Sequence, residues 1–159
     1  MLHSLTLDVL SIQDTQRYAD TLASCFTEGV VYLIGDLGAG KTTFTRYFLE
    51  SFGHEGAVKS PTYTIVEPYH IDGRNIFHFD LYRLDDPYEL ELMGIRDYLE
   101  EDHALFLFEW PSKGDGEIPM ADITLRIEKT EDEQARKFTF ESDSKRLIEL
   151  IQEHLNAKR

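Results

Sequence analysis

The stretch from Gly35 to Thr42, GDLGAGKT, limits the possible folds of this chain more than any other feature. It matches the pattern G-x-x-x-x-G-K-[ST], in which a glycine-rich loop joins a buried strand to a helix. Residues 30–34, VVYLI, form the continuous apolar run that is typical of a buried parallel strand. Phe44 and Phe48 follow the loop at helical spacing. The sequence therefore predicts a strand, a glycine-rich loop and a helix in direct succession.

A loop of this kind can hold phosphate oxygens. Its successive backbone N–H groups face one point, and the N-terminus of the following helix adds partial positive charge there. The side chain of Lys41 can reach the terminal phosphates, and the hydroxyl of Thr42 can bind Mg²⁺. We expect a nucleotide and Mg²⁺ to bind along this loop, which comprises Gly35, Asp36, Leu37, Gly38, Ala39, Gly40, Lys41, Thr42 and Thr43.

Two acidic residues follow apolar runs that are typical of strands. Glu109 follows residues 105–108, and Asp80 follows residues 76–79. Mg²⁺ prefers oxygen ligands, and a P-loop protein needs an acid at the end of a strand near the loop. We assign Glu109 to the metal or its attacking water and place Asp80 in the same network, although either could be a surface carboxylate. The candidate catalytic residues are Lys41, Glu109 and Asp80, and the candidate metal ligands are Thr42, Glu109 and Asp80.

Other polar residues near these runs carry weaker signals. The hydroxyls of Ser60, Thr62 and Thr64 cluster in SPTYT, which fits either a sensor loop for the terminal phosphate or a turn that bonds to its own backbone. We expect a structural role for His78, which shares a strand face with Asp80. Trp110 fits either stacking near the nucleotide or, more commonly for a lone tryptophan beside a proline, packing. The guanine motifs N-K-x-D and D-x-x-G are absent from the sequence, which favours ATP over GTP.

The remaining patterns indicate a mixed α/β protein. Asp72-Gly73 is a strong hairpin signal between two strand-like segments, and a second hairpin is expected near the C-terminus. We predict a P-loop NTPase-like three-layer fold with a central, mostly parallel sheet and added antiparallel strands or hairpins, in one domain of residues 1–159. The expected strands are 64–69, 75–82, 104–108, 123–127 and 138–140, and the expected later helices are 86–93, with a short helical piece after it, and 143–155.

The charge of the chain is unevenly distributed. The formal net charge is −14, and half of it comes from residues 80–102, which contain nine acidic residues and two arginines. Such a surface repels RNA, so direct nucleic-acid binding is disfavoured. A basic protein is a more compatible partner for it. Solubility alone is the other explanation of this acidity.

Several absences suggest the cytoplasm. No apolar run is long enough to cross a bilayer, and the N-terminal residues lack the basic region and cleavage site of a secretory signal. The single cysteine, Cys25, cannot form an internal disulfide, and its position on the apolar face of the first predicted helix favours a core role. We therefore expect a cytoplasmic protein that does not contact a membrane.

Five sequence blocks together resemble the bacterial TsaE family over about residues 5–150. They are GDLGAGKTTF, SPTYT, HFDLYRL, ELMGI and FEWP, in this order. The resemblance implies a P-loop ATPase that converts ATP to ADP and acts with the TsaB–TsaD complex. The pathway forms threonylcarbamoyladenosine at position 37 of tRNAs that read ANN codons. The tRNA would then be reached only indirectly, with acidic residues 80–102, near the nucleotide, as the contact region for the complex.

The resemblance also assigns roles to individual residues. Lys41 and Thr42 would hold phosphate and Mg²⁺, Glu109 matches the Walker-B acid, and Asp80 matches the aspartate of HFDLYR. Thr62 and Thr64 match a switch-like loop. Ser11 would lie near the adenine, although the sequence alone favours a helix cap there.

Two other functions stay open at this stage. One is a small-molecule kinase of the P-loop class, and the other is a nucleotide-gated adaptor that scarcely hydrolyses. A kinase usually needs an arginine-bearing lid, and the arginines of this chain are scattered. Slow hydrolysis without the partner is expected because the sequence contains no obvious arginine finger, and Arg83 is the only candidate to test.

Overall fold

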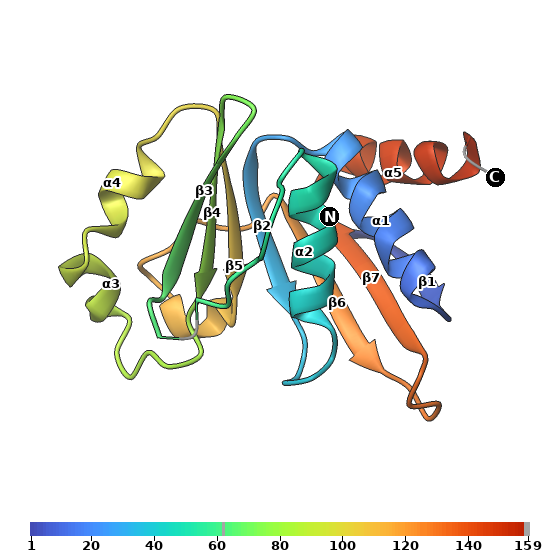
Figure 1. The fold of residues 1–159 in the computed structure, drawn as a ribbon, viewed down its shortest axis with the longest axis horizontal. Helices are drawn as coiled ribbons and strands as arrows, with labels where there is room; N and C mark the ends of the chain where they lie inside the picture. The colour runs from blue at the N-terminus through green and yellow to red at the C-terminus, as the bar shows by residue number, and fades with distance from the viewer. Residues whose placement is uncertain (62, 158–159) are drawn as a thin grey trace.

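The computed structural model describes residues 1–61 and 63–157. Its strands form a seven-stranded sheet in the order β1-β7-β6-β2-β5-β4-β3 (Figure 1). The central neighbours β6, β2, β5 and β4 are parallel, whereas β1/β7, β6/β7 and β3/β4 are antiparallel pairs. This confirms the predicted mostly parallel centre with antiparallel additions. The strands are β1 (His3–Val9), β2 (Gly29–Ile34), β3 (Val66–Ile71), β4 (Arg74–Asp80), β5 (Ala104–Glu109), β6 (Ile123–Lys129) and β7 (Arg136–Ser142).

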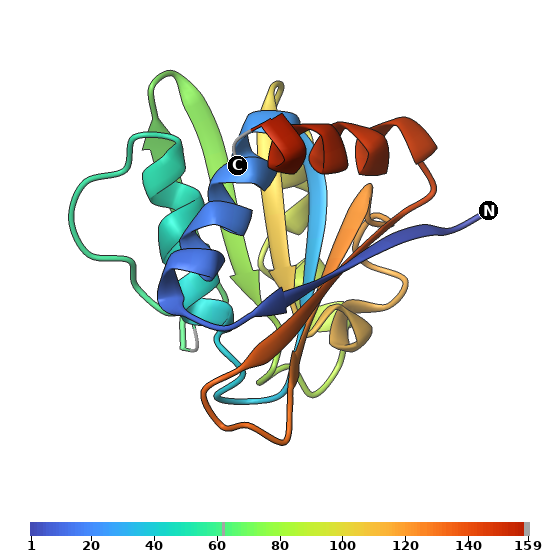
Figure 2. The same ribbon diagram turned by 90° about the vertical axis from the view of Figure 1, so that its right-hand side faces the viewer.

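The longer helices cover one face of the sheet. They are α1 (Ile12–Cys25), α2 (Lys41–Ser51) and α5 (Lys145–Ala157), and Figure 2 shows α1 and α2 side by side on that face. Each helix presents an apolar stripe to the strands, as its sequence periodicity predicts. Leu22, Phe44, Phe48 and Ile151 are completely buried in the resulting core.

Short helices cover only half of the opposite face. They are α3 (Tyr88–Leu92), α4 (Ile95–Leu99) and the 3₁₀ turn η1 (Pro111–Gly114). Phenylalanines of β4 and β5 pack beneath α3 and α4, and the rings of Phe79 and Phe108 stack with centroids 4.8 Å apart. Because both faces of β5 are covered, every residue of that strand is buried, which confirms the strand predicted from its apolar run.

The other half of this face carries polar side chains on β1, β7 and β6. The hydroxyls of Thr6 and Thr139 lie 3.2 Å apart, and the guanidinium of Arg126 donates to Glu141 at 2.5 Å. Polar side chains at alternate positions are expected on a sheet face in contact with water. The predicted three-layer arrangement is therefore present over β2, β5 and β4 and reduces to two layers over β6, β7 and β1.

One local feature differs from the sequence expectations, and another agrees with them. The predicted strand 64–69 begins at Val66, because Ile65 adopts a left-handed conformation with φ of 70°. Ser11 caps α1 as predicted and accepts a hydrogen bond from the backbone N–H of Asp14. The carboxylate of Asp14 accepts from the N–H of Leu10, one residue before the cap.

The acidic residues 80–102 run from one end of the sheet to the other. Asp80 ends β4 at the edge where the glycine-rich loop lies, and the chain then passes through α3 and α4 over the sheet face (Figure 1). Glu101 precedes β5 at the opposite end of the sheet, where His103 lies 3.4 Å from Glu28. Only the beginning of this stretch is therefore near the loop, contrary to the expectation for the stretch as a whole.

The glycine-rich loop lies at the carboxyl end of β2, where the chain connections lead to opposite sides of that strand. The chain leaves β2 through α2 toward β3 and β4 on one side, while β6 lies on the other side of β2. Ligands of open α/β sheets bind at the carboxyl ends of strands where such connections diverge. In the described part of the chain, no helix combines the length and apolar character that a bilayer crossing requires.

Candidate nucleotide-binding site

The glycine-rich loop turns sharply between β2 and α2. Gly38 and Gly40 have φ angles of 78° and 114°, in the left-handed region that glycine tolerates best. The N–H of Ala39 donates to the carbonyl of Asp36 at 3.0 Å and closes the turn. Gly40 precedes α2 and offers no side-chain cap, so the amide donors of the first helical turn are available to a ligand.

Gly35 is required for close approach rather than for an unusual dihedral angle. A Cβ atom at this position would lie 2.8 Å from the carbonyl oxygen of Ile127 on β6 and 3.4 Å from the Cβ of Ala39. The loop can therefore pack against β6 only because Gly35 has no side chain.

One cavity of about 380 Å³ brings together the candidate catalytic and metal-binding residues. The loop and α2 form one wall, and the carboxyl ends of β4 and β5 form the other. Parallel strands end at the same edge of a sheet, and the register pairs Asp80 directly with Glu109. The lining residues are Leu37, Gly38, Gly40, Lys41, Thr42, Thr43, Ser60, Asp80, Glu109 and Trp110.

Lys41 is buried at the first position of α2 and is folded back onto the loop. Its Nζ donates to the carbonyl of Gly35 at 2.6 Å and lies 3.8 Å from Oε1 of Glu109. The same nitrogen lies 4.3 Å from the ring centroid of Trp110, within cation–π range. Burial lowers the pKa of Lys41, and the negative charges of Glu109, Asp80 and Asp36 oppose this shift.

The two acids have different environments. Asp80 is half-buried, and its Oδ1 accepts a hydrogen bond from the N–H of Tyr82 at 3.0 Å. Burial raises the pKa of Asp80, and the charge of Glu109 adds to this; the Tyr82 N–H, His78 and Lys41 act in the opposite direction. Glu109 is only 5% exposed, and its Oε2 lies 2.6 Å from Nε2 of His78. The structure therefore places Asp80 toward the cavity mouth and Glu109 at its base.

The donor set fits a magnesium ion held jointly by protein and phosphate. The described residues contain no cluster of three or more His, Cys, Asp or Glu side chains that could hold a metal without further ligands. The Thr42 hydroxyl and the carboxylates of Asp80 and Glu109 line the same cavity. Mg²⁺ commonly takes one or two carboxylates and completes its shell with phosphate oxygens and water, so this set suits it.

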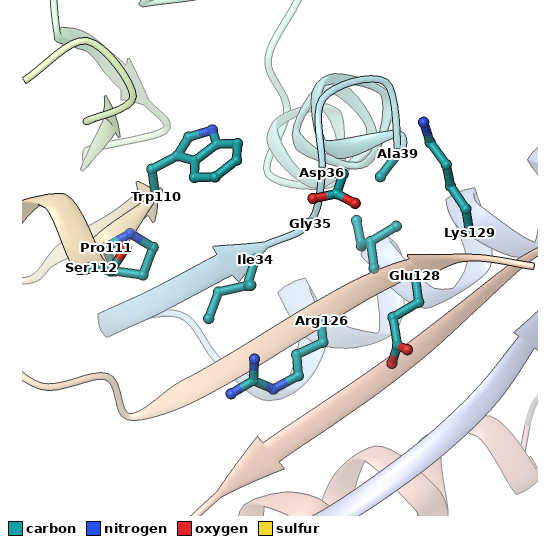
Figure 3. A pocket seen from close by; sticks show the side chains of 11 residues that line it. Ile34, Gly35, Asp36, Ala39, Trp110, Pro111, Ser112, Arg126, Glu128 and Lys129 are labelled. Atoms are coloured by element: carbon teal, nitrogen blue, oxygen red, sulfur yellow. The ribbon is translucent and has the colours of Figure 1, made fainter.

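Other predicted residues line neighbouring cavities. Gly35, Asp36 and Ala39 line a larger hollow of about 750 Å³ on the other side of the loop, where Arg126 and Lys129 of β6 also project (Figure 3). Trp110 lines both hollows.

The remaining predicted residues are dispersed. Ser11 lines a cavity of about 200 Å³ beside the loop, together with Gly40, Thr43 and Arg136. Thr64 does not line the main cavity; it is exposed, and its hydroxyl donates to Glu67 at 3.2 Å. The candidate Thr62 lies outside the described residues. The structure thus brings the loop, Asp80 and Glu109 together, places Ser11 nearby and separates Thr64.

Two contacts were not foreseen from the sequence. Trp110 packs against Tyr82, as a packing residue would, with ring centroids 4.9 Å apart, but it also covers Lys41. His78 was expected to be structural, and it contacts the acid at the base of the cavity. The alternation of side chains along β4, which puts His78 and Asp80 on one face, was the available signal for this contact.

The fold and the site define a P-loop NTPase-like α/β protein. Residues 9–138 match the family described as "Threonylcarbamoyl adenosine biosynthesis protein TsaE". The chain therefore belongs to the TsaE family, a family of proteins of threonylcarbamoyladenosine biosynthesis.

Individual relatives agree with this assignment. The chain is 56% identical to the TsaE protein of Haemophilus influenzae over 119 residues, covering 74% of this chain and 75% of the relative. It is 34% identical to the Bacillus subtilis TsaE protein, covering 89% and 87% of the two chains. A crystal structure of YdiB from Bacillus subtilis is similar, with a TM-score of 0.79 and 27% identity over 100% of this chain and 99% of that chain.

Proposed function

We propose that this chain is a single-domain, Mg²⁺-dependent ATPase that acts with the TsaB–TsaD complex. The process served would be threonylcarbamoyladenosine modification at position 37 of tRNAs that read ANN codons. One observation carries the proposal: Lys41, Thr42, Asp80 and Glu109 line one cavity at the N-terminus of α2, in a chain of the TsaE family. Each of these residue types has a defined part in phosphoryl transfer to water.

In the proposed mechanism the protein contributes positioning and charge. The amides of the first turn of α2 would hold the phosphate oxygens, and Lys41 would leave the carbonyl of Gly35 to contact the terminal phosphates. Thr42 and Asp80 would hold Mg²⁺, which when bound supplies positive charge against the transferring phosphoryl group. Glu109 would bind the metal or orient the attacking water. The products are ADP and phosphate, without a covalent intermediate.

Slow hydrolysis by the isolated chain is part of the proposal. No arginine lines the main cavity in the part of the chain described. The guanidinium of Arg83 instead lies 4.2 Å from the ring centroid of Tyr63. Because an arginine finger strongly accelerates such reactions, a partner that supplies or repositions one would raise the rate.

Steady-state hydrolysis measured with and without TsaB–TsaD tests the proposal. We expect ATP turnover to rise when the complex is added and to fall by at least about 100-fold in Lys41→Ala. The matched control is Lys59→Ala, because Lys59 is exposed and does not line the cavity. Ordinary turnover in Lys41→Ala would contradict the assignment of the site.

Magnesium titration tests the hydroxyl ligand separately. Thr42→Ala removes one oxygen from the proposed metal shell while leaving the loop backbone intact. We expect the Mg²⁺ concentration at half-maximal turnover to rise several-fold, with a smaller change in metal-free nucleotide binding. An unchanged Mg²⁺ dependence would remove Thr42 from the metal shell.

The absence of an arginine from the described cavity lining also favours a second candidate, a nucleotide-gated adaptor with little hydrolysis. Glu109→Gln separates the two functions because it keeps the shape of the side chain and removes its charge. If tRNA modification with TsaB–TsaD persists while hydrolysis is lost, the adaptor is correct. Parallel loss of both supports the ATPase.

A further inference from the structure

We propose that His78 is a positioning residue for Glu109, holding one carboxylate oxygen so that the other faces Lys41 and the main cavity. The expected effect of His78 on kcat rests on the proposed ATPase function. The orientation of Glu109 by His78 rests on geometry alone.

The two residues meet behind the cavity rather than in it. His78 is 2% exposed and Glu109 is 5% exposed, and Nε2 of His78 lies 2.6 Å from Oε2 of Glu109. The register of β4 and β5 pairs Asp80 with Glu109 and His78 with Leu107. His78 therefore reaches Glu109 from two residue pairs deeper in the sheet, on the side away from the mouth.

The contact distinguishes the two oxygens of Glu109. Oε2 faces His78, while Oε1 lies 3.8 Å from Nζ of Lys41. A carboxylate on a Glu side chain rotates easily about its last torsion angle, which has a broad energy minimum. A short hydrogen bond at one oxygen restricts that rotation and leaves the other oxygen aimed at the site.

The hydrogen-bond partners of the two ring nitrogens of His78 indicate which of them carries a proton. Nδ1 of His78 is buried and has no partner among the described residues, whereas Nε2 faces a carboxylate. A proton on Nδ1 alone would turn a bare nitrogen lone pair toward the lone pairs of Glu109. A proton on Nε2 makes the imidazole the donor and the carboxylate the acceptor. The arrangement therefore requires a proton on Nε2 of His78.

An unpartnered buried nitrogen is unfavourable, and its presence beside a functional acid calls for a reason. Leucine would fill a similar space without leaving a polar atom unpaired. The imidazole supplies what leucine lacks, a rigid N–H donor aimed at Glu109. Groups that orient active-site ligands from behind commonly contribute about 10–100-fold to affinity or activity.

Steady-state kinetics with TsaB–TsaD tests the consequence. We expect His78→Leu to lower kcat by about 10–100-fold while the dissociation constant for Mg-ADP changes less than about threefold. Of the two roles proposed for Glu109, we take orientation of the attacking water, which does not involve the bound nucleotide. His78→Gln keeps an N–H donor near the position of Nε2 and should recover most of kcat. His70→Gln is the matched control, because His70 is exposed on β3 and bonds to Asn75.

Imidazole ¹⁵N NMR tests the geometry without any turnover. The chain has six histidines, and the resonances lost in His78→Gln identify those of His78. We expect a proton on Nε2 of His78, and we expect that N–H proton to exchange slowly with water. Glu109→Ala should speed that exchange, because the acceptor is removed.

The outcomes separate this inference from the proposed function. A ring without a proton on Nε2, or an unchanged kcat in a folded His78→Leu variant, would overturn the role of His78 while leaving the ATPase intact. A native chain that hydrolyses no ATP even with TsaB–TsaD would overturn the proposed function and the kinetic part together. The Nε2–H resonance would then still decide whether His78 orients Glu109.

Discussion

The position of Asp80 disfavours the negative charge of its own carboxylate. Its carboxylate is half-buried at the end of β4, opposite Glu109 in the sheet register. Burial and the charge of Glu109 both raise its pKa, so the ionised form is less favourable in the folded protein than in the unfolded chain. A bound cation would reverse this balance. Proteins commonly lose some stability at functional residues of this kind.

The first prediction concerns the stability of metal-free protein carrying Asp80→Asn. We expect the variant to be more stable than the native chain at pH 7, by about 0.5–1 kcal/mol, because it removes a disfavoured charge from a partly solvated position. The folded-state pKa of Asp80 lies above its ordinary value of 3.8. The destabilisation is therefore fully present above the folded-state pKa and disappears as the pH falls toward 3.8.

Urea unfolding in EDTA from pH 7 downward measures this difference. The advantage of Asp80→Asn should shrink steadily on acidification. Asp143→Asn, at an exposed carboxyl before α5, serves as the control and should stay within about 0.5 kcal/mol of the native chain. A variant less stable than the native chain at pH 7 would show that the ionised carboxylate stabilises the empty site.

At the scale of elements, patterns within one segment were predictable and pairings between segments were not. The glycine-rich loop, the buried run of β5 and the hairpin at Asp72-Gly73 each depend on neighbouring residues, and all are present in the structure. The approach of His78 to Glu109 depends on the register between β4 and β5, which no local pattern specifies. The cover that Trp110 provides over Lys41 likewise depends on how the turn after β5 meets the loop.

The second prediction tests the close approach of the loop to β6. Gly35→Ala places a methyl group 2.8 Å from the carbonyl oxygen of Ile127, so the loop must move away from the strand. We expect a loss of about 1–3 kcal/mol in stability. We also expect weaker nucleotide binding, because the amides of the displaced loop no longer converge. Chemical denaturation and calorimetric titration with Mg-ADP measure the two effects.

Gly116→Ala is the matched control for this prediction. Gly116 has a φ of 86°, and a Cβ atom there would meet nothing within 4 Å. Its substitution should cost about 1 kcal/mol through backbone strain alone and leave nucleotide affinity unchanged. Equal affinity losses in the two variants would mean that general destabilisation, rather than loop displacement, weakens binding.

At the scale of the whole molecule, the acidic stretch is spread over the length of the sheet. Some of its charges already have structural roles: Glu89 accepts hydrogen bonds from the N–H groups of Asp85 and Asp86, and Glu91 pairs with Arg96 at 3.0 Å. Reversing these charges would disturb α3 and α4 as well as any interface. Exposed acids at the two ends of the stretch are therefore better probes of where the proposed partner, TsaB–TsaD, would dock.

The third prediction compares Asp85→Lys with Glu101→Lys, which change the net charge equally. Asp85 lies five residues after Asp80, at the end of the sheet that carries the glycine-rich loop, which we call the nucleotide end. Glu101 lies at the opposite end of the sheet, before β5. A partner that responds to the bound nucleotide must contact the nucleotide end, and charges farther than about 8 Å from an interface are largely screened at physiological salt. We therefore expect Asp85→Lys to weaken binding to TsaB–TsaD about 3–10-fold, mainly through slower association at low salt, and Glu101→Lys to change it less than about twofold.

Surface plasmon resonance at two salt concentrations measures both variants. Equal weakening would show that net charge alone attracts the complex, and stronger weakening by Glu101→Lys would place the partner at the far end of the sheet.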